Sequence, residues 1–256
     1  MENVNVDGIN IAYVRHGAGP SLVLIHGYPL DHSIWEDVVP LLEDSFDLIL
    51  PDLRGFGESD LMEADDSIVG YATDIVGLLT QLKVQRAFVA GHSMGGYVAL
   101  AFAREFSNRV LGLAMISSQA QGDSPERKQG RYATAQQVME QGVGMVADTM
   151  APKLSANSRV QKYAHDLISR QWPLGLASAL KAMAERPDST DLLAGFQFPL
   201  VALHGDADAL IPIERAREMK VVLPSTHLVE LVGLGHLPMM ENPEAAAEAL
   251  RFLKSN

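Results

Sequence analysis

A single serine stands between two glycines at the junction of two apolar runs. The sequence reads Gly91-His92-Ser93-Met94-Gly95, after the apolar run Phe88–Ala90 and before an apolar stretch from Tyr97. The pattern Gly-x-Ser-x-Gly between a strand and a helix is typical of a nucleophile elbow, a sharp turn that exposes the serine hydroxyl. The glycines leave room where strand and helix cross closely. The sequence therefore predicts that Ser93 is a nucleophile.

A serine hydroxyl needs a base that takes its proton, and the base follows the serine in chains with this elbow. Of the eight histidines, four lie downstream of the serine: His165, His204, His227 and His236. Only His236 stands in a loop with flanking glycines, between the predicted strand Leu228–Leu231 and the last predicted helix. Packing or surface roles are expected for the other three, so His236 is predicted to be the base.

Two aspartates could orient that histidine, because both follow the predicted strand Leu200–Leu203. Asp208 lies deeper in the loop, from which its carboxylate can reach His236. Asp206 is expected to cap the turn through its own backbone. Asp208 is therefore predicted to be the third catalytic residue.

A negatively charged tetrahedral intermediate also needs hydrogen-bond donors that are already in place. One predicted donor is the backbone N–H of Met94, directly after the nucleophile. The second is the N–H of Tyr28, in the loop that follows the predicted strand Leu22–Ile25. Gly27 lets this loop approach the serine, whereas Pro29 has no N–H to offer.

Strand and helix patterns alternate around these residues, which predicts an α/β fold with a mostly parallel central sheet flanked by helices. A hairpin is expected around Asp7-Gly8. The other predicted strands are Leu22–Ile25, Leu48–Leu50, Ala87–Ala90, Val110–Ile116 and Leu200–Leu203. The predicted helices are Ile34–Leu42, Ile68–Leu82, Met94–Glu105, Glu214–Val222 and Pro243–Leu253.

The alternation breaks between about Gln119 and Ala194, where apolar residues recur at helical spacing and no strand pattern is present. We expect three or four helices inserted between two strands of the sheet. The alternative is that these helices simply extend the core. The predicted division is a core of residues 1–118 and 197–256 and a helical cap of residues 119–196.

Composition narrows the possible partners and cofactors. A net charge of -12 disfavours nucleic acids and anionic membrane surfaces as partners. The chain has no cysteine, which excludes disulfides and thiolate zinc sites. It also has no His-Glu-x-x-His motif and no clustered carboxylates at ligand spacing, so neither a metal nor another cofactor is expected. The N-terminal residues are polar and no long apolar run occurs, so a cytoplasmic location is expected. The oligomeric state stays open.

Five motifs together resemble the α/β-hydrolase superfamily. They are His26-Gly27-Tyr28-Pro29, Asp52–Ser59, Gly91–Gly96, Gly205–Asp208 and Gly235-His236. The first and third, with Tyr97, resemble more narrowly the branch of small esterases, enol-lactonases, acyl-homoserine-lactone hydrolases and cofactor-free haloperoxidases or perhydrolases. The resemblance implies an α/β-hydrolase fold and a cofactor-independent enzyme that cleaves a small carboxylic ester or lactone through an acyl-serine intermediate.

Two other functions stay open. Perhydrolase-like relatives also carry a proline at the position of Pro29, so peracid formation from peroxide is an alternative activity. A ligand receptor without catalysis is the alternative from another functional class. Four residues near the predicted site are candidates for lining the substrate pocket: Pro29, His32, Trp35 and Met239. His32 and Trp35 fit the pocket and the core equally well.

Overall fold

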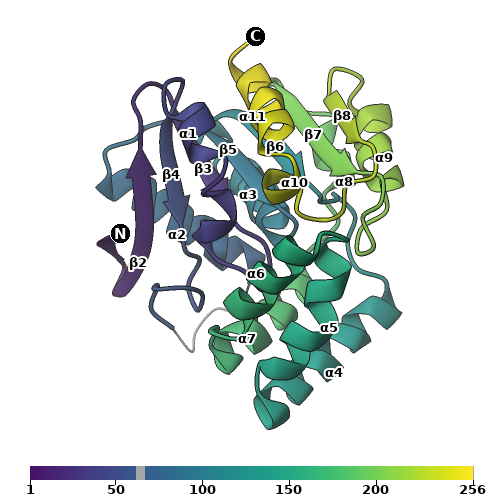
Figure 1. Ribbon diagram of the computed structural model, residues 1–256. Coiled ribbons are helices and arrows are strands. Elements are labelled where there is room, and N and C mark those ends of the chain that lie inside the picture. Colours follow the sequence, from purple (N-terminus) through teal and green to yellow (C-terminus); the bar gives the residue numbers. More distant parts are fainter. Residues whose placement is uncertain (62–66, 256) are drawn as a thin grey trace.

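Eight strands form one sheet in the order β1-β2-β4-β3-β5-β6-β7-β8 (Figure 1). The computed structural model describes residues 1–61 and 67–255. The strands are β1 (Glu2–Val6), β2 (Ile9–His16), β3 (Ser21–Ile25), β4 (Asp47–Pro51), β5 (Ala87–His92), β6 (Val110–Ile116), β7 (Leu200–Gly205) and β8 (His227–Leu231). From β4 to β8 every neighbouring pair is parallel, whereas β1–β2 and β2–β4 are antiparallel. The predicted mostly parallel sheet is confirmed.

The predicted hairpin is confirmed at the N-terminal edge of the sheet. Val6 pairs with Ile9 across the turn. The two turn residues Asp7 and Gly8 have φ angles of 49° and 94°, a left-handed conformation that aspartate and glycine tolerate. This edge lies far along the sheet from β5, which carries the serine motif.

Helices cover both faces of the sheet (Figure 1). They are η1 (His32–Trp35), α1 (Val39–Leu42), α2 (Ile68–Gln81), α3 (Met94–Glu105), η2 (Ser107–Arg109), α9 (Glu214–Val222), α10 (Pro238–Glu241), α11 (Pro243–Arg251) and η3 (Phe252–Lys254). No helix within residues 1–61 and 67–255 combines the length and the apolar character that crossing a membrane requires.

The continuous helix expected over Ile34–Leu42 is wrong. The segment forms a short 3₁₀ turn, η1, followed by the four-residue helix α1. Pro40 explains the break, because it has no N–H for a helical bond and its ring would clash with the carbonyl of Glu36. A proline is tolerated only in the first turn, which is where it lies in α1.

Five helices separate β6 from β7 in the chain: α4 (Pro125–Gln141), α5 (Gly144–Leu154), α6 (Ser158–Ile168), α7 (Pro173–Glu185) and α8 (Thr190–Leu193). In Figure 1 α4 to α7 gather in teal and green beside one end of the sheet. Helix α4 packs on α7, and α5 packs on α6. The number of helices exceeds the expected three or four by the single turn α8. The assignment of residues 119–196 as a separate cap stays a prediction.

Candidate active site

Ser93 occupies the turn between β5 and α3 in a backbone conformation that residues other than glycine rarely adopt. Its φ and ψ angles are 51° and -113°, and it is the N-cap of α3. The Ser93 N–H donates to the carbonyl of Ile116 at 2.9 Å, and the Ser118 hydroxyl donates to the Ser93 carbonyl at 2.8 Å. Both neighbours, His92 and Met94, are buried, whereas Ser93 is partly exposed. The turn therefore presents the hydroxyl, as the motif predicts.

The two motif glycines mark the closest contacts of this turn. A Cβ built on Gly91 would lie 2.1 Å from the carbonyl oxygen of Gly95, so strand and helix touch backbone to backbone. A Cβ on Gly95 would lie 2.4 Å from the carbonyl oxygen of Ile25, at the end of β3. Real Cβ atoms do not approach carbonyl oxygens this closely, so both positions require glycine.

Asp208 and His236 form a buried pair beside the elbow. Oδ2 of Asp208 lies 2.7 Å from Nδ1 of His236, and the two side chains are 0% and 1% exposed. They follow β7 and β8, which are adjacent in the sheet. The loops after parallel strands open at the same sheet edge, so this topology brings the two residues together. The structure thus joins the aspartate and the histidine that the sequence reasoning selected.

Three backbone contacts fix the histidine loop. The carbonyl of His236 accepts a hydrogen bond from Nε2 of His92 at 2.8 Å, and the two rings meet edge to face. The N–H of His236 donates to the carbonyl of Leu154, the last residue of α5, at 2.8 Å. The Asp206 carboxylate accepts from the N–H of Gly233 at 2.6 Å. Asp206 was expected to cap its own turn. Its carboxylate instead binds the neighbouring loop, because the loops after β7 and β8 lie in contact.

Burial and charge set the protonation of these groups. Burial alone would raise the pKa of Asp208, but its electrostatic interaction with His236 and hydrogen bonds from His204 and His236 lower that pKa far below its ordinary value. Burial lowers the pKa of His92 well below its ordinary value, so this ring is neutral. With Asp208 ionised, the N–H of His236 Nδ1 points to it and the Nε2 lone pair faces away.

Nε2 of His236 is buried and has no hydrogen-bond partner among the described residues. The His92 and His236 ring centroids lie 4.8 Å apart, which places His236 next to the residue that precedes Ser93. A lone pair left free in this way can accept the serine proton. Catalytic hydrogen bonds are often long without substrate and shorten when it binds.

Tyr28 and Met94 carry the two backbone N–H groups that are predicted to bind the oxyanion. Neither Tyr28 nor Met94 gives its backbone N–H to a backbone acceptor in the part of the chain that is described. The contact of Gly95 with the end of β3 holds the N-terminus of α3 against the loop that contains Tyr28. This end of a 12-residue helix also carries partial positive charge. The arrangement can hold an oxyanion.

Buried histidines and aspartates also shape the loop that carries Tyr28. Nε2 of His26 accepts from the N–H of Leu53 at 2.9 Å, and Nδ1 donates to the Gly27 carbonyl at 3.1 Å. Burial lowers the pKa of His26, consistent with this neutral ring. Asp52 accepts from the backbone N–H of Glu58 at 3.0 Å. The Asp52–Ser59 turn therefore supports the loop that carries Tyr28.

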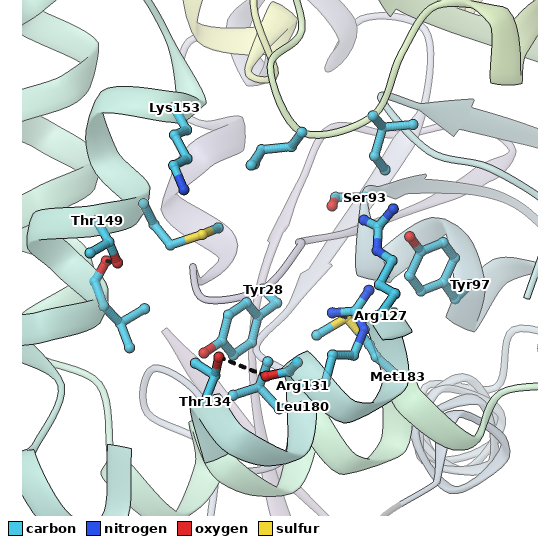
Figure 2. A pocket seen from close by; sticks show the side chains of 15 residues that line it. Tyr28, Ser93, Tyr97, Arg127, Arg131, Thr134, Thr149, Lys153, Leu180 and Met183 are labelled. Atoms are coloured by element: carbon cyan, nitrogen blue, oxygen red, sulfur yellow. Dashed lines mark hydrogen bonds between the residues drawn. The ribbon is translucent and has the colours of Figure 1, made fainter. Parts of the chain in front are cut away.

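A cavity of about 390 Å³ opens beside Ser93 (Figure 2). Its lining comes from the loop that contains Tyr28, from Ser93 and the first turn of α3, from α4, α5 and α7, and from the loop after β7. The lining residues are Tyr28, Ser93, Tyr97, Arg127, Gly130, Arg131, Thr134, Val146, Thr149, Met150, Lys153, Leu180, Met183, Leu210 and Ile211. The volume is that of a small-molecule site.

The four residues predicted to line the pocket are not among them. Trp35 and Met239 are 0% exposed and belong to the core. His32 is bound to the Asp52 carboxylate through Nδ1 at 2.7 Å. Pro29 is buried, in a turn closed by a 2.9 Å hydrogen bond from Leu30 to Gly27. The expectation is therefore corrected: Trp35 and Met239 pack in the core, Pro29 lies in a buried turn, and Asp52 holds the His32 ring.

The residues that do line the pocket come mostly from helices whose inward face depends on tertiary packing. The one sequence signal that could have found them is the pair Arg127 and Arg131, four residues apart on α4. Residues with this spacing lie on one face of a helix. Met150 and Met183 also line the cavity.

Three side chains bring potential metal ligands together in the described part of the chain: Asp31, His32 and Asp52, whose ligand atoms lie within 4.8 Å of one another. Their atoms already have internal partners. Asp31 caps η1 by accepting from Ser33, and Asp52 accepts from the N–H and Nδ1 of His32. We therefore assign this group to loop structure and not to metal binding.

Comparison with known proteins agrees with the geometry. A model described as "Alpha/beta hydrolase family" matches residues 22–249. A pimeloyl-[acyl-carrier protein] methyl ester esterase from Vibrio campbellii is 30% identical over 247 residues, which cover 92% of this chain and 95% of that protein.

Solved structures are similar over the whole chain. A thermophilic esterase from Thermogutta terrifontis, with malate bound, is 37% identical and gives a TM-score of 0.95, covering 100% of this chain and 99% of that one. The enol-lactonase from Burkholderia xenovorans is 24% identical, with a TM-score of 0.91 and full coverage of both chains, a likeness that shows the fold. The α/β-hydrolase fold expected from the sequence is confirmed.

Proposed function

The chain belongs to the alpha/beta hydrolase family, and from this premise we propose that it is a serine hydrolase that cleaves carboxylic esters or lactones through an acyl-serine intermediate. The observation that carries the proposal is the buried Asp208–His236 pair beside the strained, partly exposed Ser93. The esterases among its relatives support the same class of reaction.

In the proposed mechanism the Ser93 hydroxyl attacks the ester carbonyl carbon while Nε2 of His236 takes its proton. Asp208 holds the imidazole in the required tautomer and stabilises the imidazolium. The Tyr28 and Met94 N–H groups stabilise the oxyanion of the tetrahedral intermediate. Collapse breaks the bond to the leaving oxygen, which receives the proton from His236.

The second half of the reaction repeats these steps with water. His236 takes a proton from a water molecule, whose oxygen attacks the acyl-serine carbonyl. Breakdown of the second tetrahedral intermediate releases the carboxylic acid, and the proton returns from Nε2 to Ser93. The helices inserted between β6 and β7 act in this proposal as a cap, because α4, α5 and α7 supply most of the pocket wall.

The test is turnover of 4-nitrophenyl acetate by the wild type and by Ser93→Ala. We expect the variant to lose roughly 10⁴- to 10⁶-fold in kcat. A fluorophosphonate should label the wild type once, with the adduct at Ser93. Labelling at another serine, or turnover no faster than that of Ser93→Ala, would contradict the proposal; the second result would favour a ligand receptor.

A further inference from the structure

The pocket beside Ser93 is cationic in an acidic protein. The chain has 32 acidic and 20 basic residues. The lining of the pocket reverses this balance: it holds Arg127, Arg131 and Lys153, and no aspartate or glutamate among the residues described there. Figure 2 shows Arg127 and Arg131 entering from α4 and Lys153 extending toward the cavity from α5. Such local reversal of charge points to an anionic ligand.

The positive charge is only partly neutralised within the protein. Asp123, with a side chain that is 0% exposed, pairs with Arg131, with Arg186 at 2.9 Å and with Arg127 at 3.4 Å. One carboxylate cannot balance three guanidinium groups. Within the described residues, Lys153 forms no ion pair or side-chain hydrogen bond. The pocket wall therefore keeps a net positive charge.

Two donors on this wall lack a strong acceptor. Nη1 of Arg131 donates to the sulfur of Met183 at 3.3 Å, and a thioether is a weak acceptor. The hydroxyl of Tyr28 is buried and has no hydrogen-bond partner in the described part of the chain. Burial raises the pKa of Tyr28 well above its ordinary value although the charge of Arg131 lowers it, so the hydroxyl remains a donor. A buried donor without a partner is costly, which favours a ligand that supplies the acceptor.

Much of the remaining wall is apolar. Val146, Met150, Leu180, Leu210 and Ile211 contribute alkyl and thioether surface to the same cavity as the cationic residues and Ser93. A ligand that fits both parts has an alkyl chain with a carboxylate at one end.

We propose that the pocket selects esters that carry a second, free carboxylate, which binds to Arg127, Arg131 and Lys153 while the ester carbonyl lies at Ser93. This inference rests on the proposed function and specifies its substrate class: half-esters of dicarboxylic acids. The guanidinium fork of an arginine matches the two oxygens of a carboxylate. The free carboxylate thereby positions the ester for attack.

The experiment compares two esters of the same shape at low salt: monoethyl adipate, and ethyl 6-methylheptanoate, in which an isopropyl group replaces the carboxylate. The wild type should show a kcat/KM for the charged ester that is roughly 10- to 100-fold higher. Arg131→Met and Lys153→Met should each reduce this ratio. Lys153→Met is the decisive variant: Lys153 is exposed and makes no ion pair or side-chain hydrogen bond with any described residue, so its exchange should not destabilise the protein. Arg159→Met is the control, since that side chain is 83% exposed on α6 and the ratio should not change.

A measurement of adipate binding tests this inference independently of the proposed esterase activity. Calorimetry should detect binding of adipate to the wild type and to Ser93→Ala, and at least tenfold weaker binding to Lys153→Met. Adipate binding without ester turnover would support the cationic site and contradict the esterase proposal. Turnover of both esters at equal kcat/KM, or adipate binding unchanged in both Lys153→Met and Arg131→Met, would overturn the inference and leave the esterase proposal intact.

Discussion

Nε2 of His204 lies 3.2 Å from Oδ2 of Asp208, the oxygen that is also 2.7 Å from Nδ1 of His236. The other carboxylate oxygen accepts from the N–H groups of Leu210 and Ile211, at 2.8 Å and 3.0 Å. Both oxygens of this buried carboxylate thus have partners, which fixes its direction toward His236. A rigidly held carboxylate is what the orientation of a catalytic histidine requires.

Exchange of each aspartate for asparagine should distinguish Asp208 from Asp206. Asp208→Asn should lower kcat by roughly 10³-fold or more, because an amide favours the wrong tautomer of His236. Asp206→Asn should retain most activity, since the Asp206 carboxylate hydrogen-bonds, among the described residues, to the N–H of Gly233 on the neighbouring loop and not to His236. Both rates are measured with 4-nitrophenyl acetate. Equal losses, or a larger loss for Asp206→Asn, would exchange the two roles.

The sequence analysis expected a packing or surface role for His204. The structure shows that its ring hydrogen-bonds inside the protein, so we expect its exchange to lower the stability. His204→Leu removes a hydrogen bond to a buried carboxylate and leaves the carbonyl of Ile211 without its 2.8 Å contact. We expect the free energy of unfolding to fall by about 1.5–3 kcal/mol in urea denaturation. His165→Leu is the control, because its pair with Asp148 is exposed and should contribute little. Equal stability of the two variants would contradict this role.

A methyl group at Gly95 should disrupt the elbow. The added Cβ would meet the carbonyl oxygen of Ile25 at 2.4 Å, which backbone atoms must move to relieve. We expect Gly95→Ala to destabilise the protein by roughly 1–3 kcal/mol and to lower kcat, since Ser93 and Met94 move with the turn. Gly144→Ala is the matched control: nothing lies within 4 Å of its added Cβ. A Gly95→Ala variant with wild-type melting temperature and kcat would contradict this account.

The elbow, the hairpin and the Asp208–His236 pair could be predicted because each depends on local signals or on strand order. Gly91 and Gly95 stand where the strand and the helix of an elbow touch backbone to backbone, a contact that requires glycine. The loops after neighbouring parallel strands lie at the same edge of the sheet, which brings Asp208 and His236 together. The pocket wall could not be predicted in the same way. Which face of α4 or α5 turns inward depends on packing against other helices. Trp35 and Met239, which were predicted to line the pocket, are buried in the core.

Acid should remove the contribution of Asp123 to stability. Burial raises the pKa of this carboxyl, but hydrogen bonds and charge from Arg131 and Arg186 outweigh burial and lower the pKa below its ordinary value. A folded-state pKa below the unfolded value of about 3.9 stabilises the protein above that pH, and the stabilisation disappears as pH falls through the folded-state pKa. Asp123→Asn should therefore cost roughly 3–5 kcal/mol at pH 7, because it leaves buried guanidinium groups unpaired.

The difference in unfolding free energy between the wild type and Asp123→Asn should then shrink steadily below about pH 4, because the wild-type carboxylate is progressively protonated. Asp166→Asn is the matched control: Asp166 pairs with Lys162 at 2.6 Å, but both side chains are largely exposed, so its loss should change stability little at any pH. Urea unfolding across this pH range provides the measurement. If the cost of Asp123→Asn is the same at pH 3 and pH 7, the ionised carboxylate is not what holds Arg131 and Arg186 in place.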